Sequence, residues 1–443
     1  MTAVLTSYRS QCFVIVSFLL SGCGAWLGGK EAPPLPGERI SIMLFQRDLT
    51  PDPRIADLAV RLPKPEINKD WPQSGGYADH AMHHLKVAET VTEAWRVDIG
   101  TGSGGGRRLL SPPVVVDGTV YAVDVNFVVS AFQATDGRRL WRFDPKVPKN
   151  DREAFGGGIA YEGGRIFLTT GFAMVFAINA SDGTEAWRQN ATGPIRAAPT
   201  ATGGRIYVIT IDNELTAYNA ATGDKLWSHA GFAEAAGVLG GASPAVSGST
   251  VIVPYSSGEI FALRVENGRE IWSDNLAALR GLNKISSLTD IRGRPVIDRG
   301  LVLAISHSGR MVAIDQRTGG RAWDRDIGGV EMPWVAGEFI YLVTNESELV
   351  GLTRSGGRVR WIRPLPRFED AKNREDLIHW SGPVLISDRL VVVASYGDAL
   401  SVSPYTGEIL GRINLPDGAS LAPVVAGGTI YILTNNAKLI ALR

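Results

Sequence analysis

Cysteine is nearly absent from this sequence. The 443 residues include two cysteines, Cys12 and Cys23, and both lie near the N-terminus. Most of the chain therefore has no thiol that could form a disulfide, bind a metal, hold a covalent haem or act as a nucleophile. Net charge is lacking too, because 45 basic and 45 acidic residues are interspersed along the chain. This balance argues against nucleic acid or anionic lipid as a partner.

Long apolar runs are also scarce. The run Cys12–Leu20, which follows the basic Arg9, is much shorter than the roughly 20 residues that span a bilayer as a helix. It is typical of a signal peptide, and it ends in Leu20-Ser-Gly-Cys23, which resembles the lipobox of bacterial lipoproteins. We expect residues 1–22 to be removed and Cys23 to carry lipid, including palmitate. Ordinary cleavage nearby, which would leave a free thiol, is the alternative.

The residue after the lipobox bears on localisation. The residue after the cysteine is Gly24 and not an aspartate. In such lipoproteins this implies delivery to the outer membrane, so we expect the protein on the periplasmic face of that membrane. The mature chain stays electrically neutral, and the lipid rather than a basic patch would hold it to the membrane.

Motifs of catalysis and cofactor binding are lacking. The sequence contains no P-loop, no G-x-S-x-G and no H-E-x-x-H, and Gly102–Gly106 resembles a phosphate loop only in composition. His80, His83 and His84, with Asp79, could hold a metal. A solvated or docking stretch is the interpretation we favour, and we expect no catalytic residue, no metal and no cofactor.

Turn residues, in contrast, are abundant. Fifty-one glycines and 24 prolines without a short period favour an all-β fold. The octapeptide ATDGRRLW, Ala134–Trp141, returns as ASDGTEAW, AATGDKLW, VENGREIW and QRTGGRAW, and more loosely as RSGGRVRW. Its closing position recurs about every 45 residues, a period that belongs to β-propeller blades. The closing residues are Trp95, Trp141, Trp187, Trp227, Trp272, Trp323, Trp361 and the degenerate Gly411.

The spacing inside each unit separates constant from variable parts. A turn residue, such as Gly204, opens the central strand pair 23 or 24 residues before each closing position. The stretch from a closing position to the next opening turn varies from 14 to 28 residues. Insertions confined to this connection enlarge one face of a propeller, which is usually the binding face. The longest connections are residues 273–299 and 362–387.

The count of units predicts how the ring closes. Eight strand pairs begin along the chain, but the last pair, residues 428–442, has no outer strand, and the outer strand Glu93–Trp95 has no pair before it. Joining the two completes an eighth four-stranded blade and removes an open sheet edge. We therefore predict an all-β, eight-bladed propeller over residues 71–443, with a lead-in at 71–91 and a proline-rich tether at 23–70.

The recurrent tryptophan has a structural explanation. An indole on the outer strand can cover the seam between two blades and bury on the order of 200 Å². The glycine four residues before it permits positive φ in the turn between the two outer strands.

This tryptophan-bearing pattern is similar to the quinoprotein, or PQQ-like, repeat of pyrroloquinoline-quinone dehydrogenases. For those enzymes the resemblance implies a cofactor site with a disulfide between adjacent cysteines, a bound calcium and a catalytic aspartate. The present sequence has no adjacent cysteine pair.

The lipobox, the tether and the ring without cofactor residues together resemble the BamB family of lipoproteins over roughly residues 20–443. The resemblance implies a non-enzymatic role in the BAM complex, binding to a POTRA domain of BamA beside other BAM subunits, and assistance to nascent outer-membrane proteins. A quinoprotein dehydrogenase and a propeller lipoprotein for another envelope ligand are the alternatives.

The resemblance also implies partner-contacting residues in two connections on one face. In the family, one connection carries a Leu-Arg pair ahead of Gly-x-Ser-Ala-Pro; Val238-Leu239 before Gly240–Pro244 matches it loosely, without the arginine. The other carries Asp-x-Asp before a proline; Asp290-Ile-Arg292 before Pro295 matches it, with Arg292 in place of the second aspartate. Ordinary loop packing is the alternative for each position. The expected partner-binding residues are Val238, Leu239, Gly240, Leu288, Asp290 and Arg292.

Overall fold

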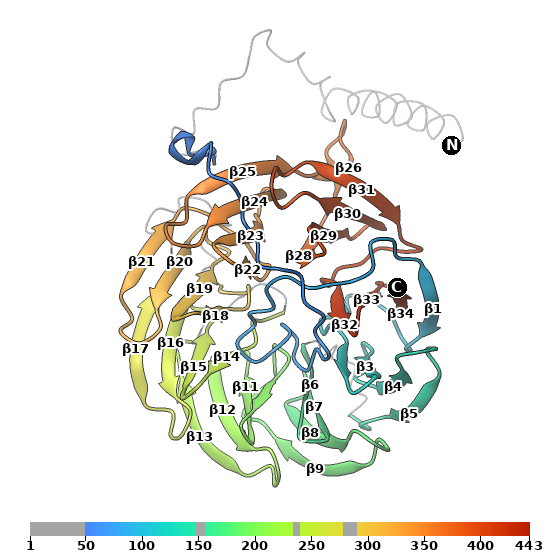
Figure 1. Cartoon of the computed structure of the whole chain (residues 1–443). Helices are drawn as coiled ribbons and strands as arrows, with labels where there is room; N and C mark the ends of the chain where they lie inside the picture. The colour runs from blue at the N-terminus through green and yellow to red at the C-terminus, as the bar shows by residue number, and fades with distance from the viewer. Residues whose placement is uncertain (1–48, 148–155, 234–239, 278–289) are drawn as a thin grey trace, which may run out of the picture. The chain divides into compact units, whose positions relative to one another are not determined.

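The computed structural model describes residues 49–147, 156–233, 240–277 and 290–443. The described chain belongs to one compact unit, Leu49–Arg443. Its strands form eight four-stranded antiparallel sheets arranged as the blades of a ring (Figure 1). The predicted all-β, eight-bladed propeller is therefore confirmed.

The blades follow one another along the chain, each with its strands in order from the inside of the ring outward. Blade 1 contains β2 (Val114–Val116), β3 (Thr119–Val123), β4 (Val129–Gln133) and β5 (Arg139–Phe143). Blade 2 contains β6 (Gly157–Glu162), β7 (Arg165–Thr170), β8 (Met174–Asn179) and β9 (Glu185–Asn190). Blade 3 contains β10 (Thr200–Thr202), β11 (Arg205–Ile209), β12 (Glu214–Asn219) and β13 (Lys225–Ala230). Blade 4 contains β14 (Ala245–Ser247), β15 (Thr250–Pro254), β16 (Glu259–Arg264) and β17 (Glu270–Asn275).

The second half of the ring repeats this order. Blade 5 contains β18 (Val296–Asp298), β19 (Leu301–Ile305), β20 (Met311–Asp315) and β21 (Arg321–Arg325). Blade 6 contains β22 (Trp334–Ala336), β23 (Phe339–Val343), β24 (Glu348–Thr353) and β25 (Val359–Pro364). Blade 7 contains β28 (Trp380–Ile386), β29 (Arg389–Ala394), β30 (Asp398–Val402) and β31 (Ile409–Asn414). Blade 8 contains β32 (Val424–Ala426), β33 (Thr429–Leu433), β34 (Lys438–Leu442) and β1 (Glu93–Asp98).

Two further elements lie outside the blades. The insertion before blade 7 forms a small hairpin of β26 (Phe368–Asp370) and β27 (Glu375–Leu377). The 3₁₀ helix η1 (Pro53–Ile55) precedes the ring. No helix in the described ranges is both long enough and apolar enough to cross a membrane.

The hydrophobic core lies between the blades. Successive residues of a strand point to opposite faces of its sheet, so they enter two different cores. On β7, Ile166 and Leu168 join the cluster shared with blade 1, while Phe167 joins the cluster shared with blade 3. Inner strands therefore read as continuous apolar runs, whereas outer strands alternate, as β13 does with Trp227 buried between exposed neighbours.

The ring is closed by the two ends of the chain. β1 pairs with β34 in antiparallel register, with Trp95 opposite Ala441 and Val97 opposite Leu439. The predicted closure of the eighth blade is therefore confirmed, and blade 8 has four strands like the other seven.

The seven tryptophans each bind the following blade in the same way. Each indole N–H donates to a carbonyl that lies three residues before the glycine in the next blade's outer turn, at 2.8–3.1 Å. Each ring also lies against that glycine, where a Cβ atom would come within 2.5–2.9 Å of indole carbons. The glycine of the repeat thus does two things: it adopts positive φ and leaves room for the indole of the preceding blade.

The missing indole at Gly411 follows from the closure. An indole at position 411 would contact the turn between the third and fourth strands of the next blade, which is blade 8. In blade 8 those two strands are β34 and β1. Because they come from opposite ends of the chain, no turn joins them. The degenerate copy of the repeat therefore marks the position of ring closure.

Residues 68–87, here called the crossing segment, run over the middle of the ring (Figure 1) and contact the inner part of every blade. Trp71 exchanges two backbone hydrogen bonds with Val115 of blade 1, at 2.6 and 3.0 Å. The Gln73 side chain bonds both backbone groups of Ala201 in blade 3. The other six blades are also hydrogen-bonded to the segment: blades 2, 4, 5, 6, 7 and 8 bond Pro72, Ala78, Asp79, His83, Leu85 and Asn68, respectively.

The boundary of the propeller unit consequently differs from the sequence-based one. The sequence predicts a tether over residues 23–70, whereas the compact unit begins at Leu49. The amide of Asp52 donates to Val359 of β25 at 2.8 Å, and Asn68 accepts from the amide of Gly427 at 2.9 Å. Residues 1–48, with the predicted signal peptide and Cys23, lie outside the described residues.

The histidines of the crossing segment bond different blades. His80 is 2% exposed, and its Nδ1 lies 2.7 Å from the carbonyl of Pro295. The Nδ1 atom of His84 lies 2.7 Å from the carbonyl of Pro63, and its Nε2 accepts from the amide of Asp388. Within the described ranges, no group of three or more histidine, cysteine or acidic side chains is placed to hold a metal ion. The side chains of His80 and His84 therefore dock the segment on the ring, whereas His83 contributes its carbonyl, which accepts from the Trp334 indole.

The buried imidazole of His80 predicts a pH-dependent stability. Burial lowers its pKa from 6.5 to about 3. The unfolded chain then binds more protons between these two values, so the contribution of His80 is present above pH 6.5 and is lost as the pH falls. The expected loss at pH 5 is roughly 2 kcal/mol relative to pH 7. Urea unfolding of the wild type and of His80→Gln at both pH values checks this.

Two results of that experiment are distinguishable. The Gln variant should lose less stability than the wild type between pH 7 and pH 5, because its side chain does not titrate. Equal losses in both proteins would show that the acid sensitivity arises elsewhere.

Candidate functional site

The variable connections of the ring gather on one face. In a four-stranded antiparallel blade, the connection that leaves the last strand emerges on the same side as the turn between the second and third strands. We call this side the connection face. The crossing segment instead contacts the turns between first and second strands, such as Gly427 and Ser387, on the opposite face.

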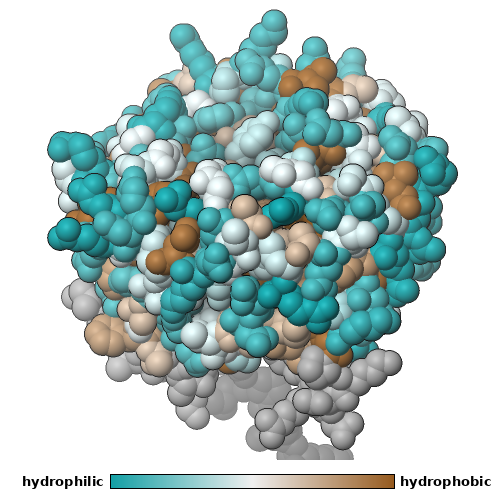
Figure 2. Space-filling model, turned by 90° about the horizontal axis from the view of Figure 1, so that it is seen from below, coloured by the Kyte–Doolittle hydropathy of each residue, from teal (hydrophilic) through white to brown (hydrophobic). Residues whose placement is uncertain are grey.

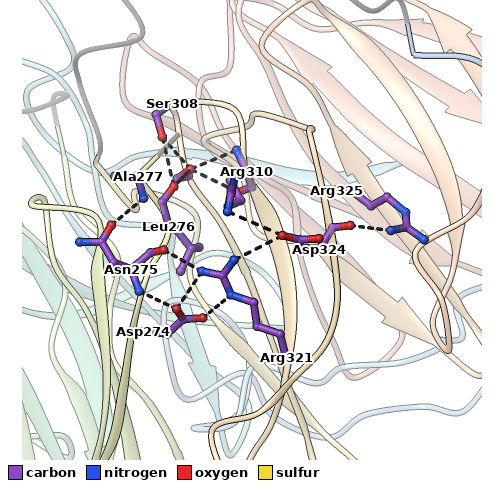
Figure 3. Close-up of polar contacts among 10 residues, drawn as sticks. Asp274, Asn275, Leu276, Ala277, Ser308, Arg310, Arg321, Asp324 and Arg325 are labelled. Carbon is purple, nitrogen blue, oxygen red and sulfur yellow. Dashed lines mark hydrogen bonds and ion pairs between the residues drawn. The ribbon is translucent and has the colours of Figure 1, made fainter. Parts of the chain in front are cut away.

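The long connection between blades 4 and 5 is fixed at both ends. Leu276 is fully buried, its amide donates to Gly258 at 2.7 Å, and its carbonyl accepts from the hydroxyls of Ser306 and Ser308 (Figure 3). At the other end, Ile291 is 1% exposed and lies in the same hydrophobic cluster as Leu276. Residues 278–289 between these ends lie outside the described part of the chain.

A charged cluster reinforces the first of these ends. Arg321 of β21 makes a two-pronged ion pair with Asp274 of β17, at 2.7 and 2.8 Å, and also donates to the carbonyl of Asn275 (Figure 3). Asp324 lies within 3.3 Å of the same guanidinium and 3.6 Å of Arg310. The contact joins blades 4 and 5 where the connection begins, so it fixes the first residues of the connection in place.

The structure describes three of the six predicted partner-binding residues, and it brings them together. Gly240, in the connection before blade 4, lies so close to Arg292 that a Cβ atom would be 3.3 Å from its Nε. Asp290 is only two residues from Arg292, in the connection before blade 5. Val238, Leu239 and Leu288 lie outside the described residues.

Arg196 is a member of this site that sequence reasoning missed. It belongs to the shorter connection before blade 3, and its Nη1 lies 3.1 Å from Asp290 Oδ2. Asp290 is 3% exposed and Arg196 is 20% exposed in their side chains, so the pair is largely buried. The side chain of Arg196 also lies against Gly241.

Two small cavities adjoin these connections. One is lined by Arg196, Gly241, Asp290 and Ile291 with residues of blades 3 and 4. The other lies at blades 1 and 2 and is lined by Arg107, Arg108 and the glycines Gly156–Gly158, among others. Each wall contains both signs of charge: Arg196 lies beside its ion-pair partner Asp290 in the first, and Asp124 accompanies Arg107 and Arg108 in the second.

The outer edge of the ring offers a contrast. On the face drawn in Figure 2, apolar residues occur in small groups separated by hydrophilic ones. Leu140 and Leu226, on the outer strands β5 and β13, are exposed at 39% and 43%. Scattered apolar residues are usual on a solvated surface, so we assign the candidate site to the connection face.

Comparisons with known proteins identify the family. The family model described as outer membrane protein assembly factor BamB matches residues 125–363. The BamB of Xanthomonas campestris is 30% identical over 371 residues, which cover 80% of this chain and 86% of that protein. The crystal structure of BamB from Moraxella catarrhalis, at 18% identity, covers 80% of this chain and 100% of its own, with a TM-score of 0.68.

An enzyme with the same fold is also similar in structure. The quinohemoprotein alcohol dehydrogenase of Comamonas testosteroni covers 84% of this chain and 80% of its own, with a TM-score of 0.64 and 15% identity. At that identity, the likeness shows a shared propeller alone. The family model and the sequence relative together extend through most of the ring, and the chain belongs to the BamB family of outer membrane protein assembly factors.

Proposed function

We propose that this protein is a non-enzymatic scaffold of the outer-membrane β-barrel assembly machinery and that its connection face binds a POTRA domain of BamA. Its relatives are named assembly factors of outer membrane proteins. The observation that carries the proposal is the convergence of Gly240, Asp290 and Arg292, from two separate connections, at one place.

The Arg196–Asp290 pair has a defined task in this proposal. A largely buried ion pair is costly to break, because removing one partner leaves the other charge uncompensated. Asp290 therefore holds Arg196 in one position and lies between connections that would otherwise move independently. We infer that the pair shapes the binding surface, while the apolar residues Leu239 and Leu288 supply contact area.

The partner-binding proposal predicts the effect of Asp290→Arg. The substitution places two arginines together and should weaken BamA association at least tenfold, as should Leu239→Asp. Affinity for the isolated POTRA domains of BamA, and co-purification in mild detergent followed by mass spectrometry, measure this.

A matched control separates binding from folding. Lys225→Glu, on the outer strand of blade 3, also reverses one charge but lies away from the connection face, and it should leave BamA binding unchanged. If Asp290→Arg and Leu239→Asp lowered the melting temperature in proportion to the loss of binding, the residues would be structural. Co-purification of bound quinone with dye-reducing activity, in place of BamA, would favour a dehydrogenase.

We further propose that lipid on Cys23 anchors the protein to the periplasmic face of the outer membrane. Cys23→Ala should move the protein to the soluble fraction or leave the signal peptide attached, because no acyl chain can then be added. Membrane fractionation and the mass of the N-terminal peptide check this. An unchanged, processed membrane fraction would contradict lipid anchoring at this residue.

A further inference from the structure

Phe232 is an aromatic residue whose side chain lies in solvent on the connection face. It follows β13 by two residues, at the start of the connection from blade 3 to blade 4 that also contains Gly240. Its exposed fraction of 73% is the highest among the large apolar side chains of the described residues. An aromatic ring contributes to stability by being buried, so this ring contributes little to the fold and is available to a partner.

The backbone at Phe232 is fixed by two buried polar side chains. The amide of Phe232 donates to Glu259 Oε2 at 2.9 Å, and its carbonyl accepts from the side-chain amide of Asn213 at 2.6 Å. Glu259, on β16 of blade 4, is 8% exposed, and Asn213, beside β12 of blade 3, is 2% exposed. The amide of Gly231 donates to the Asn213 carbonyl at 2.9 Å. Three hydrogen bonds therefore hold two successive residues in one conformation.

The residues that hold Phe232 are themselves held in place. Asn213 adopts a positive φ of +59°, and its Oδ1 accepts from the amide and the hydroxyl of Ser256, at 3.1 and 2.9 Å. At Gly231, a Cβ atom would lie 2.5 Å from the ring of Tyr255, which is 1% exposed. The chain therefore passes in close contact with blade 4, and ordered groups fix the backbone from which the Phe232 ring projects.

Phe232 and the Arg196–Asp290 ion pair belong to one continuous surface. Asn213, which holds the Phe232 carbonyl, lines the same cavity as Arg196 and Asp290. The connection that begins with Phe232 also returns to the candidate site at its other end, at Gly240. A partner that covers this cavity would therefore contact the exposed ring and the ion pair together.

We propose that Phe232 is an anchor residue whose ring inserts into an apolar pocket of a POTRA domain of BamA, a role that rests on the proposed BamA binding. Aromatic side chains in well-packed pockets dominate the energetics of protein interfaces. A side chain on a backbone that is already fixed loses little conformational freedom on binding. The Arg196–Asp290 pair would then belong to the polar surroundings of an apolar contact, the usual arrangement in protein interfaces.

The first test measures the affinity of the purified full-length lipoprotein for the POTRA domains of BamA by calorimetry. Phe232→Ala should weaken binding on the order of tenfold or more, the effect of removing a hot-spot side chain. Phe232→Tyr, which keeps an aromatic ring, should bind nearly as the wild type does. Leu226→Ala is the matched control, because it removes an exposed apolar side chain of the same blade on β13, and it should leave the affinity unchanged.

The melting temperature separates an anchor from a structural residue. Because the Phe232 ring lies in solvent, Phe232→Ala should melt at the temperature of the wild type. A fall in melting temperature in proportion to the loss of affinity would overturn the proposal. A wild type whose self-association is abolished by Phe232→Ala, with POTRA affinity unchanged, would show that a second copy covers the ring, and this result too would overturn the proposal.

The remaining outcomes distinguish the anchor from the function on which it rests. Equal POTRA affinity of Phe232→Ala and the wild type would overturn the anchor and leave the proposed BamA binding supported. A wild type that binds no POTRA domain would overturn both.

The second test locates the contact directly. p-Benzoylphenylalanine in place of Phe232 should form a covalent adduct with the purified POTRA domains on irradiation, whereas the same group in place of Leu226 should not. Adducts at both positions, or at neither, under conditions in which the wild type is saturated with POTRA domains would contradict a specific contact at Phe232.

Discussion

Trp227→Ala is expected to lower the free energy of unfolding by about 3–5 kcal/mol, the usual range for truncating a large core side chain. The indole is 9% exposed, its N–H donates to Val265 at 3.0 Å, and its ring lies 6.0 Å from that of Tyr207. The substitution therefore removes apolar contact and one hydrogen bond at the seam between blades 3 and 4. Urea unfolding followed by circular dichroism measures the loss.

A double-mutant cycle with Gly268 tests the geometry of this seam. Gly268→Ala alone should destabilise strongly, because its Cβ would lie 2.5 Å from the indole and its φ is +71°. In the Trp227→Ala background only the backbone cost remains, on the order of 1 kcal/mol. The two changes should therefore be clearly non-additive. Additive losses would show that the indole and the glycine do not act as one contact.

Leu226→Ala is the control for this experiment. Leu226 neighbours Trp227 on β13, but it is 43% exposed and points away from the seam. Its truncation should cost well under 1.5 kcal/mol, since little of its surface is removed from water. A loss as large as that of Trp227→Ala would mean that the strand, rather than the indole, determines the stability of the seam.

The repeated part of this fold could be predicted because short sequence motifs at a regular spacing determine each blade. The spacing of Trp95 and its counterparts fixes the length of each blade. The last strand pair has no outer strand and the first outer strand has no pair before it, which predicts the observed pairing of β1 with β34. What sequence reasoning missed is not periodic. The contact between Arg196 and Asp290 joins residues 94 positions apart. Neither connection has a sequence pattern that predicts contact with the other.

The crossing segment was predicted only in part, as a lead-in at 71–91 with a solvated or docking stretch around His80, and its bonds to every blade were not predicted. Residues 63–76, at and before its start, contain three prolines and two glycines, which are typical of a flexible stretch. The crossing segment bonds the blades mostly through backbone groups. Backbone donors and acceptors are the same for every sequence. The buried side chains Trp71, Met82 and Leu85 were the available signal, but they recur with neither strand nor helix period.

The second large effect is expected from removing residues 49–87 while keeping β1. The deletion should lower the free energy of unfolding by about 5 kcal/mol or more, since fully burying each large apolar side chain is worth roughly 1.5–3 kcal/mol. The truncated chain loses Trp71, which is 3% exposed and stacks on Trp334 with ring centroids 6.4 Å apart, together with Met82 and Leu85. It also loses a set of bonds that reaches all eight blades.

Point variants show whether the effect comes from the buried face of the crossing segment. Trp71→Ala should cost about 3–5 kcal/mol, whereas Lys86→Ala, at an exposed position of the same segment, should stay within about 0.5 kcal/mol. An unchanged urea midpoint in the deletion variant would contradict a structural role for the segment. Because β1 and β34 close the ring at its outer edge and the crossing segment joins the blades at its centre, loss of the segment should also broaden the unfolding transition. Blades held only at the outer seams would then separate before the whole ring unfolds.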